Sequence, residues 1–325
     1  MISKYFIPTF FNGDKILKYL QIIDELEADL VISDYNINAS FAAVMAGVKS
    51  VFVTERHNFT LVDVEIEDLL VGGFDVNQEE ILSAQKDLNH LFKWLVKSTD
   101  LIITDKLFLD SFESDKFLKS NIGKVYFTGA MYFEREHLQP LDFEYLKIDK
   151  NSPYIVCTVS STTMLSKNKE NNFQFYIDSY KRLKKDIPDL QLVMLGNSDK
   201  PINDSGIVKL PYLPNWKELI QNSSILISHP GWITVTEAAY LNIPSLFYLS
   251  SFSEYHELEA YRRLEEIGIP VYSGNDVSEL YNILKKILLG EVNYSKPYTR
   301  LSPTHDGIEE ATGLIMELIE GKKNE

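Results

Sequence analysis

Short apolar runs alternate with segments of helical period along the whole chain of 325 residues. Leu30-Val-Ile-Ser and Leu101-Ile-Ile-Thr are two of the runs, and in residues 14–27 apolar side chains recur three and four positions apart, as on one face of a helix. A strand that is apolar throughout has to be covered on both faces, and a parallel sheet flanked by helices provides that cover. The sequence therefore predicts an α/β protein built from parallel sheets.

A break in this alternation predicts two domains. Residues 136–152 are charged, contain Pro140 and show no period, and after them the alternation restarts. We therefore expect a Rossmann-like, doubly wound domain over residues 1–135, a linker over 136–152 and a second such domain over 153–305. A last helix within residues 306–325 is expected to pack back on the first domain. Two doubly wound sheets that face a cleft would bind ligands at the carboxyl ends of their strands.

Composition and charge indicate which binding partners and which cellular compartment the chain can have. The chain holds 32 Lys and Arg against 47 Asp and Glu, which gives a net charge of −15 and a surface that repels nucleic acid. Cys157 is the single cysteine, so no internal disulfide can form, which fits a reducing compartment. The sequence shows neither a secretory signal nor an apolar stretch of the roughly 20 residues that span a membrane. We expect a cytoplasmic protein, with peripheral contact at the inner face of the membrane left open.

The ten residues from Ser228 to Glu237 read Ser-His-Pro-Gly-Trp-Ile-Thr-Val-Thr-Glu and carry the strongest functional signal. An apolar strand runs into a Pro-Gly turn and then into a helix, whose first amides and positive dipole end favour a phosphate. Gly231 would let the backbone approach the phosphate, His229 and Thr234 would add side-chain donors, and Glu237 could accept from sugar hydroxyls. Taken singly, His229 could bond only its own loop and Glu237 could be a solvated helix residue. The spacing of the whole string argues against both alternatives.

This string resembles His-x-Gly-Trp-x-Ser/Thr-x-x-Glu, the donor-nucleotide signature of glycosyltransferases with two Rossmann-like domains, known as the GT-B fold. The sequence is most similar to family 28, the branch that contains the UDP-N-acetylglucosamine transferase of peptidoglycan synthesis. The resemblance implies a transferase that moves a hexose or N-acetylhexosamine from a nucleotide diphosphate sugar, UDP-linked, to an acceptor hydroxyl, with inversion and without a metal. It also implies that the donor contacts His229, Gly231, Trp232, Thr234 and Glu237. Ile233 stands where the plant-type signature has asparagine, so one side-chain contact to phosphate would be lost.

Two further segments match the family by position. The loop over 210–216 resembles the loop that reads the nucleobase, which makes Tyr212 and Leu213 candidates; the alternative is a proline-rich turn before a helix. The run that follows the predicted strand at 154–159 resembles the loop near the phosphates. Its candidate donor-binding residues are Ser160, Ser161 and Thr162.

A third segment lies at the predicted helix start near residue 256. By position, His256 and Glu257 occupy the pair through which family members touch the hydroxyls of the donor sugar. The alternative is a solvated helix start, where acids are favoured by the helix dipole. Arg262 and Arg263, further along this helix, are expected to lie on the surface.

The front of the chain departs from the family pattern. It does not open with a strand and a Gly-rich loop, which predicts that the first domain lacks its leading strand-helix units. Three explanations stay open: a misassigned or truncated start, a partner polypeptide that completes the domain, or a domain without catalytic function. If the chain is active alone, Asp34, which ends a buried strand, and His57, which follows the next strand, are the candidates for the catalytic base. Asp34 could instead cap a turn, and His57 could be an exposed loop histidine.

The sequence predicts neither a metal site nor a cofactor, because its six histidines and one cysteine show no ligand spacing. The expected partners are the nucleotide-sugar donor and an acceptor that is a lipid-linked or surface glycan, with a small hydrophobic molecule as the next choice. Two other functions stay open: a donor-binding subunit that needs a partner chain, and a nucleotide-sugar epimerase. An epimerase would need acids and bases around the sugar, and Glu254, His256 and Glu257 are candidates for them.

Overall fold

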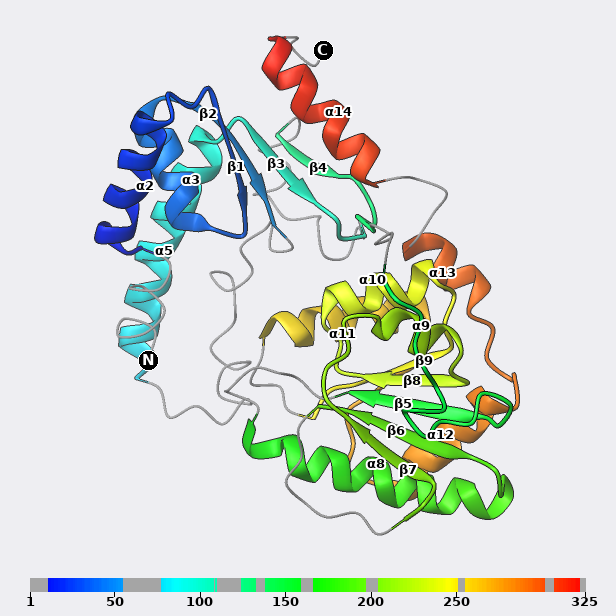
Figure 1. Cartoon of the computed structure of the whole chain (residues 1–325). Helices are drawn as coiled ribbons and strands as arrows, with labels where there is room; N and C mark the ends of the chain where they lie inside the picture. The colour runs from blue at the N-terminus through cyan, green and yellow to red at the C-terminus, as the bar shows by residue number, and fades with distance from the viewer. Residues whose placement is uncertain are drawn as a thin grey trace. The chain divides into compact units, whose positions relative to one another are not determined.

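The computed structural model describes residues 11–54, 77–107, 109, 124–132, 138–158, 166–196, 204–250, 255–301 and 307–321. The chain divides into two compact units, one of Met1–Met131 with Pro303–Glu325 and one of Tyr132–Ser302. Each unit contains a parallel β-sheet with helices packed on it (Figure 1). The expected α/β class with two parallel sheets is confirmed.

Over the described residues, the first unit has a four-stranded parallel sheet in the order β1-β2-β3-β4. Its strands are β1 (Leu30–Asp34), β2 (Lys49–Val53), β3 (Leu101–Thr104) and β4 (Val125–Phe127). Its helices are α2 (Gly13–Glu25), α3 (Ile37–Ala46), α5 (Gln78–Ser98) and, from the end of the chain, α14 (Gly307–Glu320). Asparagine side chains cap the first three helices at their N-termini, which explains where these helices begin.

Alternate side chains of this sheet pack against different helices, as the pleat of a strand requires. Phe52 and Ile102 are buried together with residues of α3 and α5. Val51 and Ile103, on the opposite face, are buried together with Ala311 of α14. The last helix of the chain therefore completes the core of the first unit (Figure 1).

Gly307 begins α14 close to the main chain that follows β4. A Cβ added there would lie 2.6 Å from the carbonyl oxygen of Gly129 and 2.7 Å from that of Ala130. Because a main-chain carbonyl cannot rotate away like a side chain, Gly307→Ala should displace the start of α14 and lower the free energy of unfolding by about 1–3 kcal/mol.

Gly313 provides a matched control in the same helix, because no atom lies within 4 Å of the position that its Cβ would take. Gly313→Ala should raise the free energy of unfolding by about 0.5–1 kcal/mol, since alanine is the better helix former. Denaturant titration of both variants checks the pair. Equal effects of the two substitutions would contradict the packing described for Gly307.

Over the described residues, the second unit has a six-stranded parallel sheet in the order β10-β9-β8-β5-β6-β7. Its strands are β5 (Tyr154–Thr158), β6 (Gln191–Leu195), β7 (Ile207–Leu210), β8 (Ile225–Ser228), β9 (Ser245–Tyr248) and β10 (Val271–Tyr272). Its helices are α8 (Ser166–Asp186), α9 (Trp216–Gln221), α10 (Trp232–Tyr240), α11 (Tyr255–Ile267), α12 (Val277–Leu288) and α13 (Ser295–Leu301). From β5 the chain runs outward to β7, then crosses back to β8 and continues to β10 on the other side. The carboxyl ends of β5 and β8 thus border the point where the strand order reverses, which is where ligands bind to such sheets.

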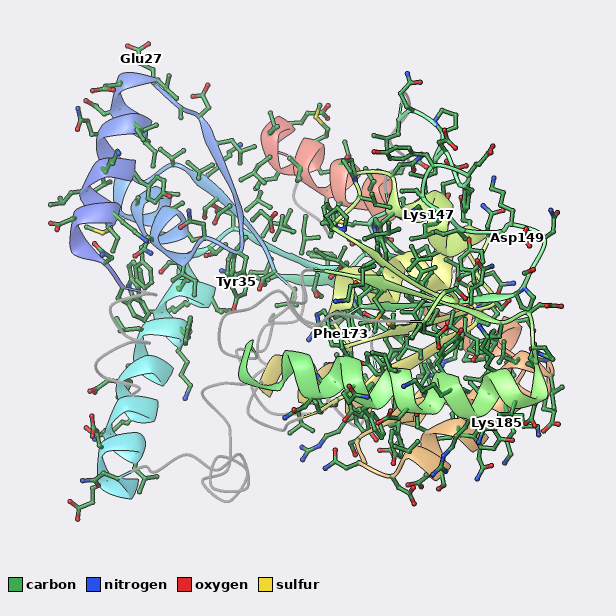
Figure 2. All side chains as sticks on the ribbon, turned by 60° about the horizontal axis from the view of Figure 1, so that its bottom comes forward. Glu27, Tyr35, Lys147, Asp149, Phe173 and Lys185 are labelled. Carbon is green, nitrogen blue, oxygen red and sulfur yellow. The ribbon has the colours of Figure 1, made fainter. Side chains whose placement is uncertain are left out.

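Helices cover both faces of the second sheet (Figure 1). Helices α8 and α12 pack together on one face, and α9 and α10 lie on the other. Helix α8 buries Phe173 in the core at 1% exposure, while Lys185 near its end is exposed (Figure 2). This division of apolar and charged side chains is what the helical period of the sequence predicts.

Helix α13 is not predicted from the sequence. It is short and contains Pro297, so its local helical signal is weak. The hydroxyl of Tyr298 donates to the main-chain oxygen of Ile243 at 2.8 Å, and that of Tyr294, just before the helix, donates to the oxygen of Ser245 at 3.0 Å. Tertiary contacts rather than local propensity therefore fix this helix.

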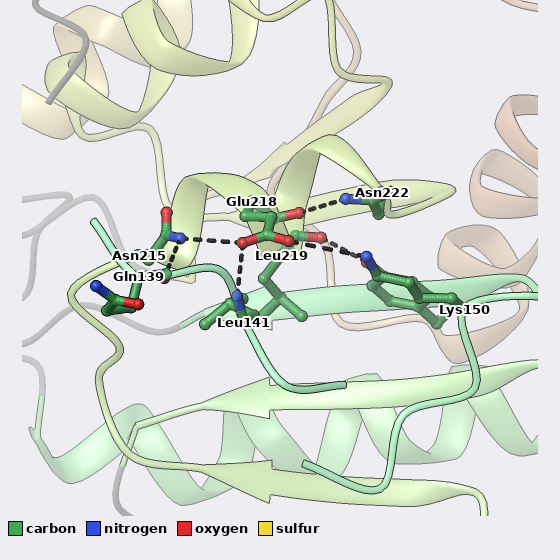
Figure 3. A network of polar contacts seen from close by, with 8 residues as sticks. Gln139, Leu141, Lys150, Asn215, Glu218, Leu219 and Asn222 are labelled. Atoms are coloured by element: carbon green, nitrogen blue, oxygen red, sulfur yellow. Dashed lines mark hydrogen bonds and ion pairs between the residues drawn. The ribbon is translucent and has the colours of Figure 1, made fainter. Parts of the chain in front are cut away.

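Residues 138–152, from the segment expected to be a linker, are part of the second unit. Phe143 is buried, and Glu218 of α9 accepts hydrogen bonds from the amide of Leu141 at 2.7 Å and from Asn215 Nδ2 at 3.0 Å (Figure 3). The absence of a period in this sequence therefore reflects an irregular segment that side chains of its own unit hold in place.

The two adjacent arginines of α11 have different environments. Arg262 is exposed as expected, but the surface position expected for Arg263 is wrong, since that residue is 1% exposed. Its Nε and Nη2 atoms both lie 2.9 Å from Oε1 of Glu259, whose side chain is 2% exposed. The opposite charges, one helical turn apart, pair with each other, which allows both to be buried.

Candidate functional site

The junction between β8 and α10 lies where the strand order of the second sheet reverses. Ser228 ends β8, and α10 begins at Trp232 after the short turn His229-Pro230-Gly231. The hydroxyls of Ser228 and of Thr158, which ends the neighbouring β5, are 2.9 Å apart. The structure thus places the 228–237 string at the edge of the sheet where a doubly wound fold binds its ligand.

Gly231 supplies space at this junction rather than an unusual backbone conformation. Its φ of −66° and ψ of 128° are extended values that any residue adopts. An added Cβ, however, would lie only 3.0 Å from Nε2 of His229. Glycine also has no side chain that could cap α10, so it leaves the approach to the first-turn amides open for an anion.

His229 is the titratable residue of the turn. Burial lowers the pKa of His229 from its ordinary 6.5 to about 4. The imidazole is therefore neutral at pH 7, where it has one N–H donor and one acceptor nitrogen. A neutral imidazole can offer a phosphate group one N–H hydrogen bond, beside the amides and the dipole of the helix start.

Two other predicted donor residues and the atypical Ile233 lie in the first turn of α10. Trp232 is buried at 4% exposure, so its ring anchors the helix start in the core. Thr234 is partly exposed, and Ile233 is 74% exposed. Because consecutive residues of a helix point in different directions, Trp232 can be buried while the next two residues reach solvent.

Glu237 has a partner that the sequence does not predict. Its Oε1 lies 3.6 Å from Nζ of Lys217 on α9, and the two side chains are 14% and 18% exposed. The same ammonium lies 4.0 Å from the ring centroid of Tyr132, which stacks on Tyr240 with centroids 3.9 Å apart. We call these four residues the Lys217 group. Tyr132 and Lys217 are distant in sequence from Glu237 and Tyr240 of α10, so only the tertiary structure brings the four together.

The remaining predicted donor residues lie on other loops of the second unit. Tyr212 follows β7 and is 73% exposed, and Leu213 next to it is partly exposed. His256 and Glu257 lie in the first turn of α11, but their side chains are outside the part described. Ser160, Ser161 and Thr162 follow β5 and also lie outside the described residues. The donor contacts of these residues stay predictions.

The two predicted catalytic residues belong to the first unit. Asp34 ends β1 and is exposed, and the amide of the next residue, Tyr35, donates to the main-chain oxygen of Val53 at 2.9 Å. His57 lies outside the described residues, so the pairing of Asp34 with His57 stays a prediction.

Among the described residues, no group of three or more His, Cys, Asp or Glu side chains is placed to hold a metal ion. Within the same part of the chain, none of the helices has the length and the apolar character needed to cross a bilayer.

Comparison with known proteins gives a family match over the second unit. Residues 159–300 match the glycosyltransferase family 28 C-terminal domain. Over 95 residues, the chain is 36% identical to the UDP-N-acetylglucosamine--N-acetylmuramyl-(pentapeptide) pyrophosphoryl-undecaprenol N-acetylglucosamine transferase of Oenococcus oeni. This segment is 28% of the chain and 26% of that enzyme, so the chain spans about a quarter of the length of the curated relative that it matches.

Solved structures match over nearly the whole chain. The glycotransferase of kitacinnamycin matches with a TM-score of 0.65 at 14% identity, over 97% of this chain and 83% of that one. A putative UDP-N-acetylglucosamine 2-epimerase from Listeria monocytogenes matches with a TM-score of 0.60 at 13% identity, over 96% of this chain and 79% of that one. Likeness at these identities shows the fold, and that fold is GT-B.

Proposed function

We propose that this chain, which carries a glycosyltransferase family 28 C-terminal domain over residues 159–300, is a glycosyltransferase with a UDP-sugar donor. The observation that carries the proposal is the junction of β8 and α10 at the reversal point of the sheet, where His229 and Gly231 precede the helix start and Glu237 follows further along the same helix. The family match includes this junction. The name of the Oenococcus oeni relative states a UDP-N-acetylglucosamine donor, which supports UDP as the nucleotide.

The proposed chemistry follows from the groups at the junction. The amides of the first turn of α10 and the neutral His229 would hold the diphosphate, with the hydroxyl of Thr234 beside them. Negative charge grows on the leaving UDP as the glycosidic bond breaks, and preformed dipoles stabilise such charge without reorganising. Glu237 would accept hydrogen bonds from the ribose hydroxyls.

The acceptor side of the proposal rests on the first unit. An acceptor hydroxyl would lose its proton to the Asp34 and His57 pair and attack the anomeric carbon from the side opposite UDP, which inverts the configuration. The acceptor would be a lipid-linked glycan, for which the support is the undecaprenol compound in the name of the relative. We include a partner polypeptide and binding at the membrane surface in the proposal, both testable by copurification with membranes.

The test is product analysis with radiolabelled UDP-N-acetylglucosamine or UDP-glucose and a lipid extract as acceptor. Transfer moves the label to an organic-soluble product and releases UDP in equal amount. An epimerase would instead change the sugar while it stays on the nucleotide, without an acceptor. Retention of label as unchanged UDP-sugar with every extract and fraction tested would contradict a transferase and favour a donor-binding subunit.

A further inference from the structure

We propose that Lys217 positions the carboxylate of Glu237 for the ribose hydroxyls of the donor and thereby sets the preference of the site for a nucleotide that carries both hydroxyls. The inference rests on the proposed function, because it takes Glu237 as the residue that binds the ribose. It adds a positioning residue from α9, a helix outside the 228–237 string.

The contact between Lys217 and Glu237 joins two helices of the second unit. Lys217 lies in the first turn of α9, and Glu237 lies in the middle of α10. Their charged atoms are 3.6 Å apart, and both side chains are more than four-fifths buried. Because both side chains are mostly buried, solvent screens this ion pair less than it screens a pair on the surface.

Tyr132 and Tyr240 fix the position of the ammonium. Lys217 Nζ lies over the face of Tyr132, at 4.0 Å from its centroid, which is a cation–π contact. The ring of Tyr132 is stacked on Tyr240, which lies one turn beyond Glu237 on α10. The ammonium of Lys217 therefore lies between the ring of Tyr132, which Tyr240 supports, and the carboxylate of Glu237.

The hydrogen-bonding capacity of a carboxylate explains why the position of Glu237 would affect ribose binding. A carboxylate can accept about four hydrogen bonds, so pairing with one ammonium leaves capacity for two neighbouring hydroxyls. Loss of the Lys217 ammonium would favour protonation of this mostly buried carboxylate or its rotation toward water. In either case it would lose acceptor sites that the two hydroxyls use.

The second unit offers a matched control for Lys217. Lys150 Nζ lies 3.7 Å from Oε1 of Glu218 (Figure 3). It also lies 4.0 Å from the ring centroid of Phe143, so it repeats the arrangement of a lysine between a carboxylate and an aromatic face. Its acidic partner belongs to the contacts that hold residues 138–152 and is not a proposed donor residue. Lys150→Met removes the same kinds of contact without touching Glu237.

The experiment is calorimetric titration of UDP and of 2′,3′-dideoxy-UDP into the wild type and the variants Lys217→Met, Lys217→Arg and Lys150→Met. Methionine keeps the apolar stem on the tyrosine ring and removes the charge, whereas arginine keeps the charge. The wild type should bind UDP about tenfold or more tighter than the dideoxy compound, the range expected of hydrogen bonds to a charged acceptor. Lys217→Met should lose most of this preference with dideoxy-UDP affinity nearly unchanged, while Lys217→Arg and Lys150→Met should keep it.

A second comparison uses Glu237→Gln as the background, because a neutral amide does not need a cation. The effect of Lys217→Met on UDP affinity should disappear in that background, which is the signature of two residues that act as a unit. The Lys217→Met/Glu237→Gln double variant removes both charges of the pair, so it keeps the comparison available if the lone buried carboxylate destabilises the single variant.

The outcomes separate the two proposals. A preference for UDP that survives in Lys217→Met, or an equal loss of both ligands, overturns the role of Lys217 and leaves the donor site standing. A wild type that binds UDP and dideoxy-UDP equally well also overturns it. A wild type that binds neither nucleotide overturns the proposed donor site itself, and the role of Lys217 with it.

Discussion

Gly231→Val should abolish UDP binding while the second unit stays folded. A Cβ added at Gly231 would lie 3.0 Å from Nε2 of His229, and the two methyl groups of valine would fill the space in front of the first-turn amides of α10. The imidazole would be displaced and the amides shielded, so the loss of several hydrogen bonds to the diphosphate should weaken binding by more than about 100-fold.

The backbone conformation of Gly231 allows the Gly231→Val variant to change ligand binding without destabilising the fold. Its φ of −66° and ψ of 128° suit valine, so no backbone strain is introduced. Unfolding by denaturant should change by no more than about 1 kcal/mol, the size of an N-cap effect. Gly231→Ala should give an intermediate affinity, because its single methyl group demands a shift of His229 of only a few tenths of an ångström. UDP binding by Gly231→Val at wild-type affinity would place the diphosphate elsewhere.

Glu259→Ala should lower the free energy of unfolding of the second unit by about 3–5 kcal/mol, because it leaves the guanidinium of Arg263 buried without its carboxylate. Arg263 is 1% exposed, and its Nε and Nη2 atoms both contact one oxygen of Glu259. Replacement of both residues by apolar ones, Glu259→Leu with Arg263→Met, should recover most of this loss, since no charge is then buried.

The ion pair of Lys285 with Asp186 provides the control. Its atoms are closer, at 2.7 Å, but both side chains are 39% exposed. Asp186→Ala should therefore cost only about 1 kcal/mol or less, because water solvates the remaining charge. Urea titrations of the three proteins give the comparison. A Glu259→Ala variant no less stable than Asp186→Ala would show that Arg263 reaches solvent or another acid.

Much of the fold could be predicted from the sequence because its strands are apolar on both faces. The strand at 101–104 has the bounds of its apolar run, which Asp100 and Asp105 mark at the two ends. Helix α13 could not be predicted, because it is held by hydrogen bonds from Tyr294 and Tyr298 to main-chain oxygens near β9, far away in the sequence. Residues 138–152 of the predicted linker (136–152) show no period in the sequence, and their contacts with Glu218 of α9 come from the tertiary structure.

The candidate site likewise contains residues that the sequence predicts and residues that only the structure reveals. The residues from His229 to Glu237 could be found because one helix start brings them together within ten positions. Lys217 and Tyr132 could not, because they reach Glu237 through the tertiary fold alone. Arg263 was placed on the surface because a charge is usually solvated, and only the structure reveals the buried acid that pairs with it.

The most direct measurement of the central claim is calorimetric titration of UDP into the intact protein and into His229→Ala. His229 is neutral at pH 7 and adjoins the start of α10, so its loss should remove one hydrogen bond to a charged phosphate and weaken binding by about 10- to 100-fold. Saturable binding by the wild type and this loss in the variant are the predicted result. No binding by the wild type, or equal affinity in the two proteins, would contradict a donor site at the junction of β8 and α10.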